Sequence, residues 1–303
     1  MSNSPKKDLR TTQLIRRLRG KLFRASRLLD QPDTPWRRRR LLDSLASHGQ
    51  HIHADAGGVL YLTVRVPYGE AAGADGGLLF PGGKSAKRLH LAAMSKIARQ
   101  PALARIARNR VVVLDTETTG LLDRPETVPF LVGLGYFGAR AFVVEQFFME
   151  DFESEPAMMK MLARRLRTAR AIFSYNGKAF DLPLLRRRFA VHRLPATIWK
   201  RPHWDILPTT RRLWGKRVRS RSLINLENEV FGFHRTHDIQ SNRIPQAYHD
   251  YLGGRRAERL AAVFDHNAQD ILTTAAIAIM LARGHLDPQD VPAALIPESS
   301  DHA

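Results

Sequence analysis

The chain is constrained most by one ten-residue stretch, residues 111–120, which reads VVVLDTETTG. Its four leading apolar residues, three of them β-branched, predict a buried strand. The strand ends in Asp115 and Glu117, and the two-residue period of a strand directs both carboxylates to one face. Two acids held together against an apolar strand resist ionisation unless a cation offsets their charge. These residues alone predict either a metal or base partner at this spot, or a strand end whose acids face water.

The residues that follow predict an α/β domain. Two apolar strands at 130–137 and 140–148, joined by a tight turn at 138–139, are expected to form an antiparallel pair. Helical periodicity at 156–167 and a short apolar run at 171–175 add a helix and a strand expected to lie parallel to the first strand. This order predicts an α/β fold of the ribonuclease-H-like type, with a mixed sheet of three antiparallel strands plus parallel strands, flanked by helices.

The last third of the chain is predicted to be largely helical. A strand edge is expected at 203–207, and Asp205 is expected to cap the helix that follows it and runs through Trp214. Further helices are expected at 223–231, 244–252 and 255–283. We therefore divide the chain into a basic N-terminal extension (1–108, helices plus a short β element and partly disordered), a ribonuclease-H-like domain (109–284) and a mobile tail (285–303).

Charge is distributed unevenly along the chain. The net charge is +19, and residues 1–110 hold 22 Lys and Arg against 7 Asp and Glu, whereas residues 111–303 hold 26 against 22. Such an asymmetry is typical of proteins with a polyanionic partner, most often nucleic acid, although a generally arginine-rich proteome would also give basic surfaces. The N-terminal part carries two basic clusters, at 14–23 and 36–40, which either contact phosphates or form solvated faces of docking helices.

Several other classes of protein are disfavoured. The chain contains no cysteine, which removes disulfides, thiolate metal sites and thiol nucleophiles. Residues 1–10 lack the apolar core of a secretion signal, and the apolar run at 271–282 is too short to span a bilayer, so we expect a cytoplasmic protein that does not contact membranes. Residues 80–85 resemble the end of a phosphate-binding loop, but Leu78 stands where that motif requires glycine.

Two further acids complete a constellation with the strand acids. Asp181 follows a glycine turn into a helix. Asp270 lies four residues after His266, so His266 and Asp270 share one face of a helix. Four carboxylates, at positions 115, 117, 181 and 270, provide oxygen ligands of the kind that Mg²⁺ or Mn²⁺ prefers.

The same residues carry a resemblance to a known family. The Asp115-Thr116-Glu117 segment, the run from Tyr175 to Leu185 (YNGKAFDLPLL) and the run from His266 to Ile271 (HNAQDI) resemble, in order, the three exonuclease motifs of the DEDD superfamily. They are most similar to those of the YprB-type ribonuclease-H-like domain family. Each motif alone is short, but three in this order and in these strand and helix contexts are specific. The resemblance covers roughly residues 111–283.

The resemblance implies two-metal hydrolysis of phosphodiester bonds. Asp115 would bridge two Mg²⁺ or Mn²⁺ ions, Glu117 and Asp181 would complete one metal site, and Asp270 would help to hold the ions. His266 would accept the proton of the attacking water. His266 stands four residues before the last Asp, a spacing that in the superfamily belongs to the tyrosine subtype, whereas the histidine subtype has five. A histidine that only forms hydrogen bonds within a packed helix is the alternative.

Asn176 and Lys178 are the candidate substrate-binding residues. Asn176 would orient a substrate phosphate, or would serve as a turn former before glycine. Lys178 would steady the scissile phosphate, or would be a solvated lysine at a helix start.

The sequence thus predicts a metal-dependent nuclease, in particular a 3′–5′ exonuclease acting on DNA or RNA, with a nucleic-acid partner. The main alternative is a catalytically inactive nucleic-acid-binding module that keeps the fold, and a weaker one is a phosphate-loop nucleotide hydrolase. Whether the substrate is DNA or RNA, single or double stranded, is left open by the sequence.

Overall fold

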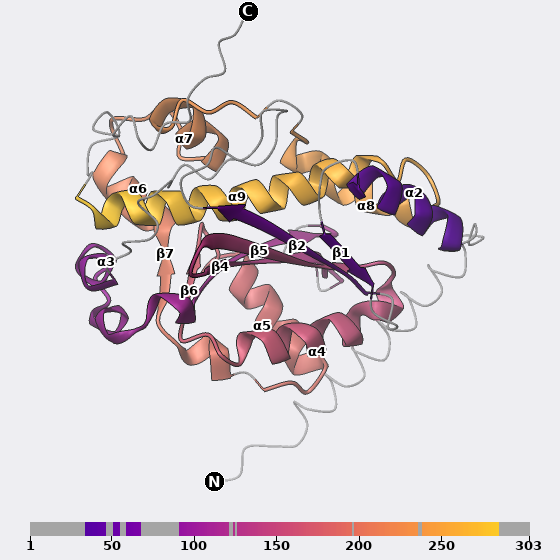
Figure 1. Cartoon of the computed structure of the whole chain (residues 1–303), viewed down its shortest axis with the longest axis horizontal. Helices are drawn as coiled ribbons and strands as arrows, with labels where there is room; N and C mark the ends of the chain where they lie inside the picture. Colours follow the sequence, from indigo (N-terminus) through magenta and orange to yellow (C-terminus); the bar gives the residue numbers. More distant parts are fainter. Residues whose placement is uncertain are drawn as a thin grey trace, which may run out of the picture.

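The computed structural model describes residues 34–46, 51–54, 59–67, 91–120, 124, 126–195, 197–235 and 238–284. In this part of the chain seven strands form one sheet: β1 (His51–Ala54), β2 (Val59–Pro67), β3 (Val111–Thr118), β4 (Pro129–Phe137), β5 (Ala141–Met149), β6 (Ala171–Ser174) and β7 (His203–Asp205). Their order across the sheet is β1-β2-β5-β4-β3-β6-β7 (Figure 1).

The sheet is antiparallel on one side of β3 and parallel on the other. β3 pairs antiparallel with β4, which pairs antiparallel with β5, and the turn between β4 and β5 lies at Gly138 as predicted. On its other side β3 pairs parallel with β6, and β6 pairs parallel with the edge strand β7. The predicted mixed α/β sheet of ribonuclease-H-like type, flanked by helices, is thus confirmed.

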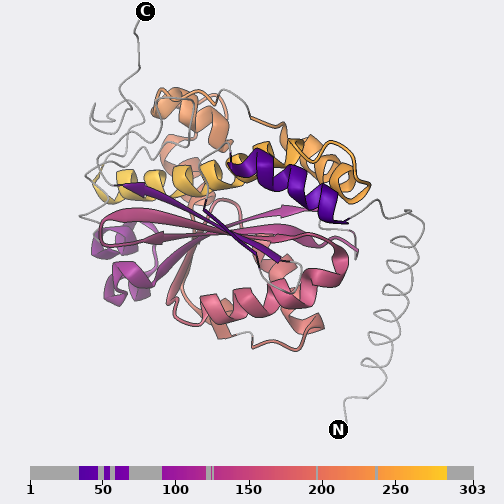
Figure 2. The ribbon, with the colours of Figure 1, turned by 45° about the vertical axis from the view of Figure 1, so that its right-hand side comes forward.

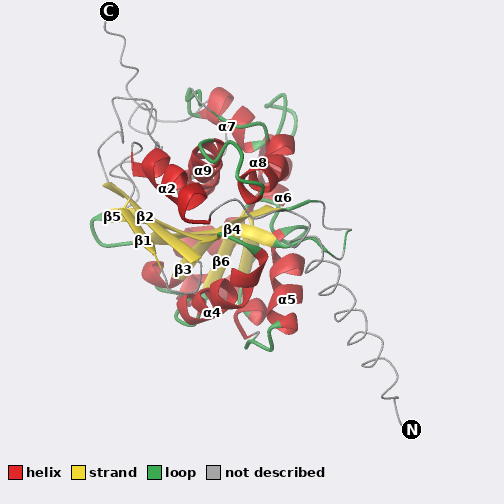
Figure 3. Ribbon diagram, turned by 90° about the vertical axis from the view of Figure 1, so that its right-hand side faces the viewer, coloured by secondary structure: helices red, strands yellow, loops and turns green. Residues whose placement is uncertain are grey.

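Helices cover both faces of the sheet. One face carries α4 (Glu155–Leu166) and α5 (Asp181–Val191), whereas the other carries α9 (Arg259–Ala282) (Figures 1 and 3). Around α9 on that face lie α2 (Thr34–Ala46), α6 (Ile206–Trp214), α7 (Leu223–Val230) and α8 (Ile244–Leu252), and α3 (Leu91–Ile97) packs against α9 at one end of the sheet.

The long helix α9 is buried around most of its circumference, as expected for a helix rich in apolar residues on every side. It approaches β4 closely because that strand carries glycines. A Cβ added at Gly133 would lie 2.3 Å from Asn267 Oδ1 and 2.3 Å from Ile271 Cδ1, and one added at Gly135 would lie 2.5 Å from Ile271 Cγ2. The glycines therefore set the depth at which the polar residues of α9 meet the sheet.

The described parts of the N-terminal third pack on the same domain. β2 pairs along its whole length with β5, and α2 lies on the α9 face beside α8 (Figure 2). The Arg37 guanidinium is buried, donates to the carbonyl of Leu252 at 3.0 Å and stacks over the Tyr251 ring at 4.8 Å. Two strands and one helix of the expected basic extension thus complete the sheet and its cover, and the domain division itself remains a prediction.

Some expectations lie outside the described residues: the basic cluster at 14–23, the loop at 80–85 and the tail at 285–303. Among the described helices, none has the length and apolar character needed to cross a membrane.

One element boundary differs from the sequence-based prediction by a residue. β3 contains both acids as predicted and continues to Thr118, which pairs with Pro129 across a register shift. The segment before β3 consists of α3 and a 3₁₀ turn at Pro101–Arg105, which starts at a proline because proline cannot continue the hydrogen-bond ladder of a helix.

Candidate active site

The strand acids lie in the second half of β3, next to a register shift between Glu117 and Thr118. Asp115 is opposite Gly133 of β4, so the space above this pair is open to a residue of α9. Asn267 fills it and donates from Nδ2 to Asp115 Oδ2 at 2.7 Å. Asn267 is itself held by Gln146 of β5, whose Nε2 donates to Asn267 Oδ1 at 3.0 Å. The carboxylate of Asp115 is therefore fixed through two neighbouring elements.

Asp181, in the first turn of α5, lies close enough to Asp115 and Glu117 for its charge to raise the pKa of both. The hydroxyl of Thr116, which alternation directs away from the strand acids, donates to Asp181 Oδ1 at 2.5 Å. The turn that leads into α5 is held by Asp205, which accepts hydrogen bonds from the backbone N–H of Asn176 at 2.8 Å and of Lys178 at 3.0 Å. Asp205 also caps α6 as predicted, accepting from the N–H of Leu207 at 3.3 Å.

The acids affect one another strongly. Burial raises the pKa of Asp115 well above its ordinary value, and the charges of Asp181, Glu117 and Asp270 raise it further. Burial likewise raises the pKa of Glu117 to about 8 and that of Asp181 to about 6. The structure thus brings together the four predicted carboxylates, in surroundings that disfavour their negative charge and favour positive charge beside them.

One positively charged side chain, Arg235, already lies beside these carboxylates. Arg235, in the connection between α7 and α8, is only 6% exposed and forms ion pairs with Glu227 and Asp270. Its Nε lies 2.6 Å from Glu227 Oε2, and Glu227 also accepts from the hydroxyl of Thr273. The surrounding carboxylates raise the pKa of Arg235, so its guanidinium stays charged at any physiological pH.

His266 lies between the carboxylates of Asp238 and Asp270. Its Nδ1 is 2.6 Å from Asp238 Oδ1, and its Nε2 is 3.7 Å from Asp270 Oδ2. The carboxylate of Asp238 can only accept, so this short contact assigns a proton to Nδ1, although Arg235 Nη1, which can only donate, lies 3.2 Å from the same nitrogen. Burial lowers the pKa of His266, but the charge of Asp270 and the hydrogen bond to Asp238 outweigh it and raise the pKa to about 9.

The donor set is chemically suited to a hard divalent cation, since it consists of carboxylate oxygens whose ionisation is suppressed by mutual repulsion. Among the described residues, however, no three His, Asp or Glu side chains stand in an arrangement that would hold a metal ion. Asp115, Asp181 and Asp270 instead accept hydrogen bonds from Asn267, Thr116 and Arg235. The residues fit a divalent metal in type. To bind one, Asp270 would have to give up its ion pair with Arg235.

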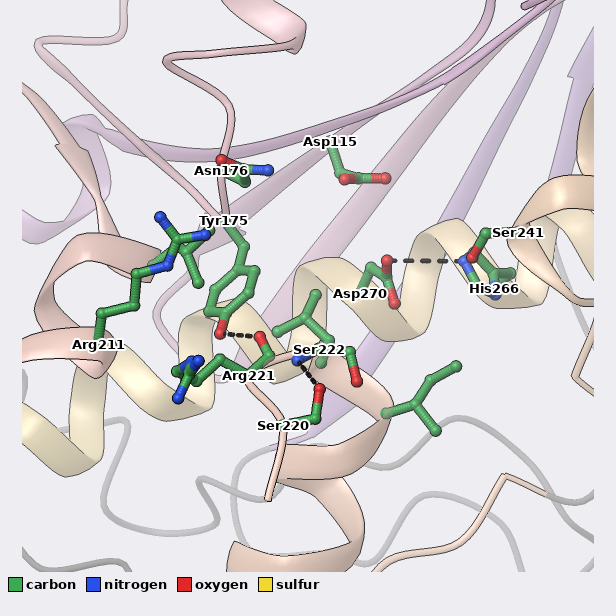
Figure 4. A pocket seen from close by; sticks show the side chains of 13 residues that line it. Asp115, Tyr175, Asn176, Arg211, Ser220, Arg221, Ser222, Ser241, His266 and Asp270 are labelled. Carbon is green, nitrogen blue, oxygen red and sulfur yellow. Dashed lines mark hydrogen bonds and ion pairs between the residues drawn. The ribbon is translucent and has the colours of Figure 1, made fainter. Parts of the chain in front are cut away.

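The acids open onto a pocket of about 480 Å³. Asp115, His266 and Asp270 lie on one side of it, and the opposite side is formed by residues of α6 and of the segment that leads into α7 (Figure 4). Tyr175 lies between the two sides, where its hydroxyl donates to the carbonyl of Arg221 at 2.5 Å.

The two candidate substrate-binding residues differ in position. Asn176 lines the pocket, and its φ of 65° places it in the left-handed region, which confirms the turn-former interpretation and leaves a phosphate contact as a prediction. Lys178 is exposed, and only its backbone N–H is held.

Sequence reasoning missed several residues of this site. Asn267 stands inside the quoted HNAQDI run, and its position one residue after His266 was a usable signal. Arg235 and Asp238 lie in an irregular connection where no periodicity exists, so nothing in the sequence indicated that they meet α9.

Comparison with known proteins gives the class. A sequence model described as the RNase H superfamily matches residues 112–282, which is more than half of the chain. The chain is 28% identical over 190 residues to "Uncharacterized protein YprB" of Bacillus subtilis (strain 168), a match that covers 61% of this chain and 45% of that protein. This chain therefore belongs to the RNase H superfamily and carries a YprB-type ribonuclease-H-like domain.

Among solved structures, the family B DNA polymerase of the archaeon Pyrobaculum calidifontis matches with a TM-score of 0.42 and 15% identity, over 55% of this chain and 24% of the polymerase. The chain spans less than half of the length of the Bacillus relative. Members of the RNase H superfamily generally hydrolyse nucleic acids, typically with divalent metals, and the chain has a nuclease-like fold.

Proposed function

We propose that the protein is a divalent-metal-dependent nuclease that hydrolyses phosphodiester bonds of DNA or RNA, as a 3′–5′ exonuclease using two Mg²⁺ or Mn²⁺ ions. The proposal is supported by four acids from three elements, Asp115, Glu117, Asp181 and Asp270, whose charges affect one another. Two of them, Asp115 and Asp270, line a pocket. A site without a cation would have no use for four mutually repelling acids.

In this proposal Asp115, Glu117, Asp181 and Asp270 hold the ions. When bound, two such ions supply an activated water and stabilise the leaving oxygen. Asn267 and Thr116 keep the carboxylates of Asp115 and Asp181 in place through their hydrogen bonds.

His266 is proposed as the residue that accepts a proton from the attacking water at Nε2, because Nδ1 is engaged with Asp238. The negative charge around it holds its pKa at about 9, too high for a base at neutral pH. Positive charge at Asp270 and Glu117 would lower this pKa toward neutrality. Base catalysis and occupancy of the acidic side are therefore linked.

The test is an assay of the purified full chain on end-labelled single-stranded DNA and RNA oligonucleotides with Mn²⁺ or Mg²⁺. Wild type is expected to shorten the strands and the Asp115→Asn variant to be inactive, while Glu153→Gln, which removes an exposed acid remote from the pocket, serves as the matched control. Equal shortening by wild type and Asp115→Asn would rule out the proposed site.

One observation favours a second candidate, a nucleic-acid-binding module without turnover. Arg235 neutralises Asp270, and no described trio of side chains is preset for a metal. This candidate predicts that Mn²⁺ leaves the melting temperature of wild type unchanged. The nuclease proposal predicts that Mn²⁺ raises it in wild type and not in Asp181→Asn.

A further inference from the structure

The pocket has a basic side that faces the carboxylates. Arg211 lies on α6, and Ser220, Arg221 and Ser222 lie in the segment before α7; all four line the cavity, and Figure 4 shows them across from Asp270 and His266. We call Arg211, Ser220, Arg221 and Ser222 the basic wall.

Neither arginine of the basic wall has a carboxylate partner among the described residues. Asp270 and His266 on the opposite side, by contrast, form ion pairs with Arg235 and Asp238. The Arg221 guanidinium donates from Nη1 to the carbonyl of Gly215 at 2.9 Å, which orients it while leaving its charge uncompensated. Arg211 is exposed and lines the pocket near the hydroxyl of Tyr175. Burial raises the pKa of Tyr175, and the charge of Arg211 lowers it by a smaller amount. Two uncompensated guanidinium groups in one cavity form a site for an anion, and phosphate matches their fork geometry best.

The start of α7 adds to this positive potential. Ser222 caps the helix by accepting from the N–H of Asn225 at 3.3 Å, and the first two helical residues, Leu223 and Ile224, line the cavity. A helix start carries partial positive charge. The start of α7 therefore adds to the attraction that the two arginines exert on an anion.

Part of the remaining lining is apolar and suits a nucleoside. Leu207, Leu223 and Ile224 line the space with the ring of Tyr175, and Ile224 is 37% exposed, which is unusual for its size. A cavity of about 480 Å³ lies within the range that holds a small ligand of this kind. One nucleoside can thus lie between the acidic side and the basic wall.

We propose that the basic wall is a phosphate-binding subsite that holds a phosphate group of the nucleic-acid strand one nucleoside away from the bond at the acidic side. This inference rests on the proposed function for the identity of the strand. The phosphate has two possible sources, an internal phosphodiester of the strand or a phosphate monoester at its end, and both present the same oxygens to Arg211 and Arg221.

The experiment measures binding without catalysis, so that its failure is distinct from failure of the nuclease proposal. A fluorescein-labelled single-stranded oligonucleotide is titrated with the full chain in EDTA, and anisotropy is followed at several salt concentrations. Arg211→Gln and Arg221→Gln are compared with matched controls: Arg212→Gln, the neighbouring arginine whose guanidinium donates to the carbonyl of Ile97, and Arg219→Gln, whose arginine pairs with Glu229. All four variants lose the same charge.

Each basic-wall variant is expected to weaken binding about tenfold and to lower the slope of log affinity against log salt by about 1. The two controls are expected to stay near wild type, and all melting temperatures to stay close together. Equal weakening in all four variants would show a general charge effect and overturn the proposal, as would unchanged binding by the basic-wall variants.

Three oligonucleotides then distinguish the sources: one ending in a 3′-hydroxyl, one ending in a 3′-phosphate, and one whose penultimate linkage is an uncharged methylphosphonate. Tighter binding of the 3′-phosphate by wild type, lost in Arg221→Gln, assigns the monoester. Weaker binding of the methylphosphonate by wild type, with no further loss in Arg221→Gln, assigns the phosphodiester. If Arg221→Gln weakens all three oligonucleotides by the same factor and wild type does not discriminate among them, the guanidinium does not contact a phosphate and the proposal fails.

Discussion

The two sides of the pocket carry opposite charge and are built differently. The acidic side projects from regular elements, β3, α5 and α9. Its carboxylates are buried or half-buried and repel one another, and those of Asp115 and Asp181 are held by Asn267 and Thr116. The basic wall lies at the end of α6 and in an irregular segment, and its arginines are partly or fully exposed. In this pocket the charges that are costly to bury are placed on regular elements, whereas the charges that solvent can stabilise lie partly in an irregular segment.

The largest effect is expected where the acidic side meets its proposed base. His266→Gln should lower the rate at saturating oligonucleotide by about 10²–10⁴-fold, because the proton acceptor is lost while the carboxylates remain. Single-turnover assays with Mn²⁺ measure the rate, and stabilisation by Mn²⁺, which should persist, serves as the control. Near wild-type activity in this variant would assign His266 a structural role only.

The metal-free protein should lose stability as pH rises from about 6.5 to 9. Glu117 has a pKa of about 8 when folded against an ordinary value of 4.5, so the folded state binds more protons in this interval and stability falls with rising pH. His266 acts in the same direction, since its contribution is complete below its ordinary value of 6.5 and is lost as pH passes about 9.

Melting temperatures in EDTA across this range test the prediction, and Glu117→Gln should give a shallower decline. Variants of the basic wall leave Glu117 and His266 unchanged, so their stability should follow that of wild type. A stability that rises across the interval would contradict the account of the acidic side.

A somewhat smaller effect, on stability, is expected at Arg235, which forms ion pairs with both Glu227 and Asp270. Arg235→Gln should lower the free energy of unfolding by about 3–5 kcal/mol, because Glu227 would stay fully buried without its counter-ion. Urea unfolding measures the change. Arg219→Gln removes an arginine that is 91% exposed and paired with Glu229, and should change stability little. Equal stability of Arg235→Gln and wild type would show that Glu227 is neutral in the folded protein.

The smallest effect is expected at the contact that sets the depth of α9. Gly133→Ala should cost about 1–3 kcal/mol, because its Cβ would overlap Asn267 and Ile271. Gly120→Ala is the matched control, since its nearest neighbour, Thr127 Oγ1, would lie 3.6 Å away at ordinary contact distance. Thermal unfolding distinguishes the two variants, and equal stability would mean that α9 shifts without cost.

Most of the fold could be predicted because its elements carry local signals. The β-branched run of β3, the turn at Gly138 and the apolar face of α8 fix element type without reference to the rest of the chain. The inclusion of Asp115 and Glu117 in β3 was predicted, whereas the continuation to Thr118 depends on its long-range pairing with Pro129 of β4.

The candidate site could be predicted only in part, for a related reason. Asp115, Glu117, Asp181 and Asp270 stand at recognisable positions of strands and helices, and they affect one another in the fold. Arg235 and Asp238 reach His266 from an irregular connection, where position depends on long-range contacts that no periodicity records. Charge runs around Arg211 and Arg221 were visible in the sequence, but which arginines face the pocket depends on the path of the segment before α7.

The central claim is that the four carboxylates form one site for divalent ions. The most direct measurement is the number of Mn²⁺ ions bound per chain at equilibrium, determined from the free-Mn²⁺ signal in electron paramagnetic resonance. The account predicts two ions in wild type, none bound with comparable affinity in Asp115→Asn, and two in Glu153→Gln. Absence of binding in wild type, or binding unchanged by Asp115→Asn, would contradict it.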